Sequence, residues 1–247
     1  MRRVLTVRDL TMGYGGEPLL EDIAFDVHRG EVFAILGGSG CGKSTLLRHL
    51  IGLQQPMAGR IHFFGIGAPA QALEPPAFGV LFQSSALFGS MTLLENVALP
   101  LRKWTRLPED AVTAVAQGRL RIVGLGGFEN HLPSEVSGGM KKRAGIARAL
   151  ALDPRLLFLD EPSAGLDPVT AAGLDELILT LRQSLGVTTV LVTHELPSIF
   201  RVADACIVLD RQAKGIIARG NPRELRDRSA DPRVHAFFHR QAIGAVP

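Results

Sequence analysis

Residues 32–44, VFAILGGSGCGKS, decide the fold. The apolar run VFAIL leads into the pattern G-x-x-x-x-G-K-[ST], and a helical pattern starts at Lys43. Glycines let successive backbone N–H groups face one anion, and a helix N-terminus adds the positive end of its dipole. The stretch therefore predicts a strand, a phosphate-binding loop and a helix. The predicted nucleotide-binding residues here are Gly37, Gly38, Ser39, Gly40, Cys41, Gly42, Lys43, Ser44 and Thr45.

Within this loop two side chains have distinct expected tasks. Lys43 is expected to reach the β- and γ-phosphates of a nucleotide, and the Ser44 hydroxyl is expected to bind Mg²⁺. Cys41 is interpreted as a spacer. The bound nucleotide is therefore predicted to carry its magnesium ion at the start of the helix.

The rest of the chain alternates between strand and helix patterns. Apolar runs bounded by turn residues predict strands near 4–10, 23–27, 32–36, 60–64, 78–81, 156–159, 188–193 and 205–209. Helical patterns lie near 43–51, 109–123, 139–152 and 170–185. This alternation predicts an α/β fold with a mainly parallel sheet. Because residues 83–152 are mostly helical in pattern, we expect an inserted helical subdomain there.

Polar side chains follow two of the apolar strands. Asp160 and Glu161 end the run LLFLDE, and His194 ends TTVLVTH. Ligands of open α/β sheets bind outside the carboxyl ends of the strands. We therefore expect Asp160 to hold Mg²⁺ and Glu161 to polarise a water molecule for in-line attack on the γ-phosphate.

The chain has 247 residues and a formal net charge of +3, and this charge is unevenly spread. Residues 211–247 carry 8 basic and 3 acidic side chains, whereas residues 1–210 carry 19 and 21. The composition, with 46% hydrophobic and 21% charged residues, excludes a disordered or fibrous chain. The sequence has only two cysteines, no signal-peptide pattern and no apolar run of membrane-spanning length. These features predict a cytoplasmic protein.

A second glycine turn opens another helix. Residues 136–140 read VSGGM and precede the helical pattern KKRAGIARAL, with Ser137 as the expected N-cap. Together with the loop at 37–44 and the acidic strand, this order of motifs resembles the ATP-binding cassette (ABC) ATPases over about residues 4–220. The further matching positions are Tyr14 (adenine-stacking aromatic), Gln83 (metal and water ligand), Asp167 in SAGLD (D-loop) and His194 (switch histidine).

The resemblance implies a fold and an assembly. It implies a P-loop NTPase (RecA-like) core with an N-terminal antiparallel β part, formed by about 1–82 and 153–220, a helical signature subdomain at about 83–152, and a basic extension at 221–247. It also implies a head-to-tail homodimer that binds and hydrolyses ATP, with catalytic roles for Glu161 and His194. The signature residues, which would contact the partner's ATP, are Ser137, Gly138, Gly139 and Met140.

Met140 departs from the common form of the signature, which has glutamine there. Methionine keeps a similar length and flexibility but loses the hydrogen bonds of the amide. We expect the backbone N–H groups of Gly138 and Gly139 to serve the phosphate and ATPase activity to persist.

Finer motifs narrow the type of cassette. SGGM, the segment FQSSALF with ENVALPLR, and DPRVHAFF in the tail are similar to the ATPases of the maintenance-of-lipid-asymmetry (Mla) and MCE-type phospholipid transporters. This resemblance implies phospholipid as cargo, an integral-membrane permease as partner, and a periplasmic MCE lipid-binding protein reached through that permease. It places the chain on the cytoplasmic face of the inner membrane.

Three alternatives remain open. The chain could power transport of another substrate, or act as a cytosolic ABC ATPase on nucleic acid, which the basic tail favours. Because basic and aromatic residues are not interleaved in that tail, no nucleic acid is expected. A non-hydrolysing cassette is disfavoured because Glu161 and His194 are both present. The helical apolar set Val234, Phe237 and Phe238 leads us to expect that the tail supports dimer or permease assembly.

Overall fold

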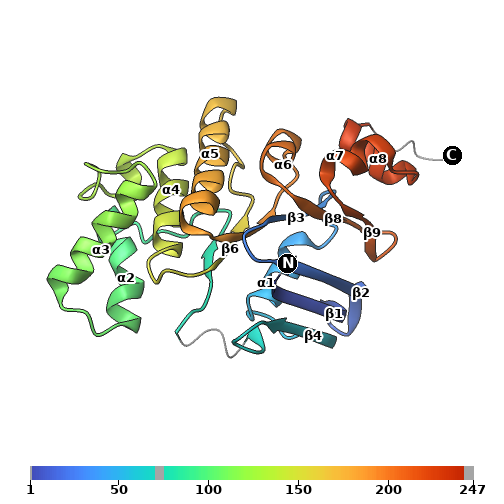
Figure 1. The fold of residues 1–247 in the computed structure, drawn as a ribbon, viewed down its shortest axis with the longest axis horizontal. Coiled ribbons are helices and arrows are strands. Elements are labelled where there is room, and N and C mark those ends of the chain that lie inside the picture. The colour runs from blue at the N-terminus through green and yellow to red at the C-terminus, as the bar shows by residue number, and fades with distance from the viewer. Residues whose placement is uncertain (1, 70–74, 242–247) are drawn as a thin grey trace. The chain divides into compact units, whose positions relative to one another are not determined.

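The computed structural model describes residues 2–69 and 75–241. These residues form two compact units, one of residues 2–69 and 190–241 and the other of residues 75–189. Figure 1 labels helices and strands of both units. None of the helices within the described ranges has the length and apolar character needed to cross a membrane.

The described residues of the first unit form six whole strands and four helices. These are β1 (Arg3–Tyr14), β2 (Glu17–His28), β3 (Val32–Gly37), β4 (Ala58–Phe63), β8 (Ala205–Asp210), β9 (Gly215–Gly220), α1 (Lys43–Leu50), α6 (Leu196–Val202), α7 (Pro222–Arg228) and α8 (Pro232–His239).

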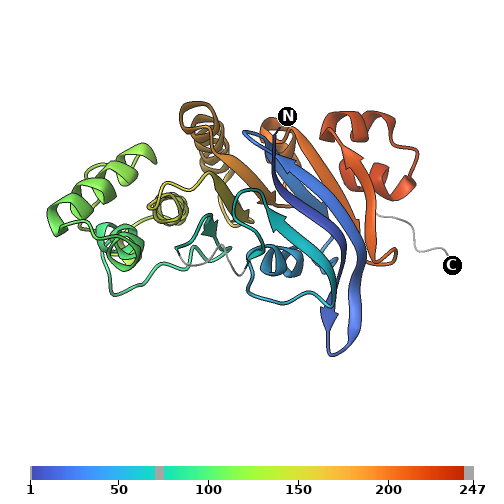
Figure 2. The ribbon, with the colours of Figure 1, turned by 60° about the horizontal axis from the view of Figure 1, so that its bottom comes forward.

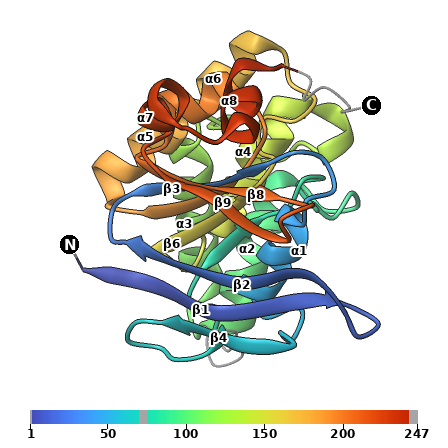
Figure 3. The ribbon, with the colours of Figure 1, turned by 90° about the vertical axis from the view of Figure 1, so that its right-hand side faces the viewer.

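An antiparallel sheet is built from β1, β2 and β4, with β1 in the middle (Figure 3). Val7 of β1 lies opposite Phe25 of β2 and Ile61 of β4, and all three side chains are buried. Thr6 and Asp26 alternate with them along the strands and are half-buried. Figure 2 shows the two long blue strands of the β1–β2 hairpin running side by side. The period-2 pattern therefore separates a core face from a polar face.

The strand that leads into the glycine loop lies in a parallel sheet. In the first unit β3 lies between residues 190–192 of β7 (Thr188–Val192) and β8, while β9 closes the edge antiparallel to β8. All six residues of β3 are buried, as expected for a strand covered on both faces.

The C-terminal helices pack onto the first unit (Figures 1 and 3). Val234 and Phe238 of α8 belong to a cluster of buried side chains contributed by β3, β8 and α6, and Phe237 packs against that cluster. The helical apolar face that the sequence suggested for assembly is therefore used inside the chain itself.

From residue 75 onward, the second unit holds two whole strands, four α-helices and a short 3-10 helix. They are β5 (Gly79–Leu81), β6 (Leu156–Asp160), α2 (Leu93–Trp104), α3 (Glu109–Ile122), η2 (Pro133–Glu135), α4 (Gly138–Ala149) and α5 (Pro168–Leu185), followed by the start of β7. Strands β5 and β6 are parallel, with Val80 opposite Phe158.

Side-chain caps begin three of these helices. Thr92 and Glu95 form a capping box at α2, while Ser137 caps α4 and Asp167 caps α5. Asn96, which is fully buried, donates to the carbonyl oxygens of residues 88, 91 and 92 and so fixes the loop before α2.

The predicted α/β class, with mainly parallel strands and an N-terminal antiparallel sheet, is confirmed. Each predicted strand and helix is present, with bounds within four residues of those expected except in β2, which begins at Glu17 rather than near residue 23. The subdomain boundaries at about 83 and 152 stay a prediction.

Candidate nucleotide-binding and hydrolysis site

The loop between β3 and α1 requires glycine for steric reasons. Gly37, Gly40 and Gly42 have φ of 147°, 72° and 101°, which L side chains rarely adopt. A Cβ on Gly37 would lie 2.5 Å from the carbonyl oxygen of Leu209 and 2.6 Å from Cys41 Sγ. The backbone is thus free to curl ahead of α1, whose first N–H groups favour an anion.

Lys43 and Cys41 have different environments in this loop. Lys43 Nζ donates to the carbonyl oxygens of Gly37 at 2.8 Å and Gly38 at 3.0 Å, which holds the ammonium at the loop. Cys41 is buried, and this burial raises the pKa of its thiol. Cys41 therefore acts as a packed spacer, and Lys43 supplies the positive charge.

Tyr14 lies beside the start of α1. Its hydroxyl is 3.0 Å from Thr45 Oγ1, and this hydrogen bond lowers the pKa of Tyr14. The side chain is otherwise 51% exposed, so a ring face is available for stacking. The structure thus brings Tyr14 and the glycine loop together, as its proposed adenine contact requires.

His194 follows β7 in the first unit. The preceding residue, Thr193, donates its N–H to the carbonyl oxygen of Ile35 at 3.4 Å, which ties this strand end to β3. His194 Nε2 lies 3.6 Å from Glu195 Oε1, and its side chain is 56% exposed. The ring is therefore accessible at the end of a strand adjacent to β3.

In the second unit Asp160 ends β6 and Glu161 follows it. Both residues are largely buried, at 8% and 7% exposure. Glu161 has φ of 46°, an uncommon backbone conformation for a non-glycine residue that costs on the order of 1–3 kcal/mol. Such strain clusters at functional sites, where the surrounding structure holds it in place.

Lys142 is a site residue that the sequence reasoning missed. Its Nζ donates to the carbonyl oxygens of Gln83 at 2.6 Å and Glu161 at 3.1 Å. Burial lowers the pKa of Lys142, and the charges of Asp160 and Glu161 oppose that effect. The available signal was helical spacing, because Lys142 shares the buried face of α4 with Gly139 and Ile146.

The glycine turn before α4 is also tightly packed. Ser137 Oγ accepts the N–H of Met140 at 3.2 Å, and a Cβ on Gly139 would lie 2.3 Å from Thr170 Cγ2. Asp167 caps α5 by accepting the N–H groups of Val169 and Thr170, each at 3.0 Å. Hydrogen bonds from Thr170 hold the pKa of Asp167 below its ordinary value.

The candidate magnesium ligands all offer oxygen. They are the Ser44 hydroxyl in the first unit, and the Gln83 amide and the Asp160 carboxylate in the second. Hard oxygen donors suit Mg²⁺, which is usually bound through one or two carboxylates together with substrate phosphates. Within the described ranges no group of three or more His, Cys, Asp or Glu could hold a metal alone.

An apolar groove of about 350 Å³ lies in the second unit. Phe78, Phe88, Leu99, Pro100 and Arg148 are among its lining residues, and Phe88 is 51% exposed. Arg148 donates to the carbonyl oxygens of Ser85 and Ala86, so the groove adjoins the segment that follows Gln83.

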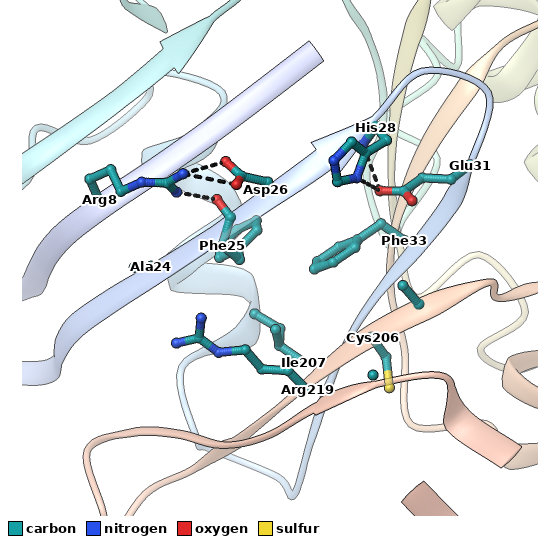
Figure 4. A pocket seen from close by; sticks show the side chains of 12 residues that line it. Arg8, Ala24, Phe25, Asp26, His28, Glu31, Phe33, Cys206, Ile207 and Arg219 are labelled. Atoms are coloured by element: carbon teal, nitrogen blue, oxygen red, sulfur yellow. Dashed lines mark hydrogen bonds and ion pairs between the residues drawn. The ribbon is translucent and has the colours of Figure 1, made fainter. Parts of the chain in front are cut away.

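A second cavity, of about 410 Å³, lies in the first unit (Figure 4). Four of its charged or titratable side chains form two pairs: Arg8 donates to both oxygens of Asp26, and His28 lies 3.6 Å from Glu31, while Arg219 also lines the cavity. Burial raises the pKa of the Cys206 thiol in its wall to about 12. A thiol with so high a pKa stays protonated at neutral pH and is a poor nucleophile.

Comparisons with known proteins match this chain to ATP-binding proteins of transport systems. A family model described as ABC transporter matches residues 20–164. The probable ribonucleotide transport ATP-binding protein mkl of Mycobacterium leprae is 42% identical over 98% of this chain and 70% of its own length. The intermembrane phospholipid transport system ATP-binding protein MlaF of Escherichia coli is 40% identical over 99% of this chain and 91% of its own.

Solved structures agree with the fold. A part of the ABC transporter complex cbiONQ from Clostridium perfringens superposes with a TM-score of 0.81 at 29% identity, covering 97% of this chain and all of that one. An ATP-binding cassette solved as a dimer with ADP and Pi gives a TM-score of 0.77 at 28% identity, covering 88% of this chain and 98% of that one.

Proposed function

The chain belongs to the ABC transporter family, and we propose that it is the ATP-hydrolysing subunit that drives phospholipid movement through a separate membrane permease. The observation that carries the ATPase activity is the glycine loop that holds Lys43 at the start of α1. The phospholipid cargo is supported by 40% identity to MlaF over nearly the full chain.

The groups proposed to bind the adenine and the phosphates belong to the first unit. Lys43 neutralises charge on the β- and γ-phosphates, the loop N–H groups from Gly37 to Thr45 hold the phosphate oxygens, and Tyr14 stacks on adenine. Ser44, Gln83 and Asp160 would hold Mg²⁺, which neutralises phosphate charge when bound.

The hydrolytic half depends on orienting one water molecule. Glu161 accepts a hydrogen bond from that water and polarises it for in-line attack on the γ-phosphorus, while His194 contacts the γ-phosphate and holds the water in place. The leaving group is ADP, and the protein forms no covalent bond to the phosphoryl group. Positioning of the water and the γ-phosphate therefore supplies most of the rate enhancement.

A homodimer completes each site. The signature residues of one protomer contact the ATP of the other; they are Ser137, Gly138, Gly139 and Met140. Asp167 is the D-loop residue. The dimeric state of the related cassette with ADP and Pi supports this assembly. The N-terminus of α4, capped by Ser137, offers N–H groups to an anion.

The permease is proposed to dock in the apolar groove of the second unit, at Phe88 and Arg148. Through the permease the chain would serve a periplasmic MCE lipid-binding protein from the cytoplasmic face of the inner membrane. An exposed phenylalanine beside a fixed guanidinium suits a helix that presents both apolar and acidic side chains.

The cargo is tested with the complex purified from native membranes in mild detergent and reconstituted in vesicles. ATP-dependent transfer of a fluorescent phospholipid is expected, and it should be lost with Glu161→Gln. Because the mycobacterial relative is named for ribonucleotide transport, a labelled ribonucleotide is offered in parallel. ATP-dependent uptake of the ribonucleotide with no lipid transfer would replace the phospholipid proposal.

A further inference from the structure

Helix α4 holds two loops of the second unit through basic side chains. Lys142 Nζ bridges the carbonyl oxygens of Gln83 and Glu161, at 2.6 Å and 3.1 Å. These two carbonyls follow different strands, since β5 ends at Leu81 and β6 ends at Asp160. One ammonium group therefore ties together the loop ends of two neighbouring parallel strands.

Of the two carbonyls that Lys142 holds, that of Glu161 belongs to strained backbone. Glu161 has φ of 46°, and its carbonyl oxygen accepts a second hydrogen bond, from the N–H of Ala164 at 3.1 Å. A non-glycine residue keeps a positive φ only where its surroundings fix it. Lys142 and Ala164 together determine the orientation of the peptide that follows Glu161.

The same device recurs farther along α4. Ser85 and Ala86 have φ of 63° and 49°, and their carbonyl oxygens accept from Arg148 at 3.0 Å and 2.7 Å. Three left-handed, non-glycine residues thus have their carbonyls held by basic side chains of this one helix. The recurrence indicates that α4 fixes the conformation of both loops.

Burying the Lys142 ammonium group costs free energy that packing alone does not explain. Its side chain is 5% exposed, and desolvation penalises the charged form. An apolar side chain of similar length would fill the same space without that cost. The amine is therefore best explained by the two hydrogen bonds that it donates.

We propose that Lys142 is a positioning residue for ATP hydrolysis: it holds the peptides of Gln83 and Glu161 and thereby sets the directions of the Glu161 carboxylate and the Gln83 amide. This inference rests on the proposed function, in which Glu161 polarises the attacking water. In this role Lys142 acts through the carbonyl groups of Gln83 and Glu161.

The expected signature is a selective loss of turnover. A displacement of about 1 Å at a reacting group lowers rates by on the order of 100-fold, so Lys142→Met is expected to lower kcat by about 10- to 100-fold. Tyr14 and the glycine loop, which are proposed to bind the adenine and the phosphates, lie in the first unit and are unchanged, so KM should stay within about twofold. Lys142→Gln keeps two N–H donors without charge and should restore most of the lost kcat.

The test measures steady-state ATPase kinetics, ATP binding and thermal unfolding for the full chain and its variants. Lys214→Met is the matched control, because it also removes a lysine amine, here from an exposed ion pair with Glu21, and it should match the wild type. A Lys142→Met variant with wild-type kcat overturns the proposal. So does a loss of kcat and ATP binding in proportion to the unfolded fraction, or a Lys142→Gln variant no better than Lys142→Met.

The ATPase activity of the wild type distinguishes a failure of this proposal from a failure of the proposed function on which it rests. An active wild type with an equally active Lys142→Met overturns the role of Lys142 alone. A folded wild-type chain that turns over no ATP overturns the proposed function, and the role of Lys142 with it.

Discussion

Replacing Phe238 by alanine tests whether α8 is part of the folded first unit. Phe238 is 3% exposed, and its ring centroid lies 5.7 Å from that of Phe200 and 5.3 Å from that of Phe237. Its neighbours come from β3, β8 and α6, which are fixed by the sheet, so the cavity left by truncation cannot collapse easily. Such Phe→Ala changes cost about 3–5 kcal/mol.

That cost is a large part of the roughly 5–15 kcal/mol that stabilises a typical domain. At about 2–4 °C per kcal/mol, the midpoint of thermal unfolding should fall by roughly 6–20 °C. Urea unfolding followed by circular dichroism gives the free energy directly. His235→Ala, an exposed position on the same helix, is the control and should change it by less than about 0.5 kcal/mol.

A cost below about 1 kcal/mol for Phe238→Ala would refute the packing argument. If the same variant kept its stability but lost the dimer or the permease, the apolar face of α8 would be an assembly surface, as the sequence alone suggested.

Three further outcomes are expected. Thr92→Ala removes the N-cap of α2 and should cost about 0.5–2 kcal/mol in urea unfolding, whereas Thr92→Ser should cost little. Burial alone raises the pKa of Asp26, but hydrogen bonds from Arg8 outweigh it and leave that pKa below 3.8. Asp26→Asn should therefore destabilise the protein at pH 7 and cost progressively less as the pH falls below that value, as seen in melts across pH. Tyr14→Ala should weaken ATP binding by about 1–3 kcal/mol, and calorimetry that finds unchanged affinity would contradict adenine stacking.

Strong local patterns made much of the fold predictable. The continuous apolar run of β3, the glycine loop and the start of α1 carry agreeing signals for strand, turn and helix. The buried strand β6 likewise ends at Asp160, and Glu161 follows directly, where the sequence placed the two carboxylates.

Weaker patterns hid other elements. Strand β9 is half-buried along nearly all of its length, so it lacks the alternation that marks a strand. Helix α2 contains Pro100, which interrupts the helical pattern, although the capping-box residues Thr92 and Glu95 indicate where the helix begins.

The candidate site likewise combines residues that the sequence indicates with contacts that it does not. Motif spacing identified the glycine loop, whereas helical spacing is the one sequence signal that separates Lys141 from its buried neighbour Lys142. Its two partners are backbone carbonyls, which carry no trace in the sequence. Contacts of this kind become visible only in the folded chain.

The most direct test of the central claim is steady-state ATP hydrolysis by the purified chain with Mg²⁺, compared with Glu161→Gln and Lys43→Ala. The wild type should turn over ATP. Glu161→Gln should bind ATP and form a stable dimer with turnover lowered by about 100- to 10,000-fold, and Lys43→Ala should lose nucleotide binding. Unchanged turnover in Glu161→Gln, or normal ATP binding in Lys43→Ala, would contradict the account.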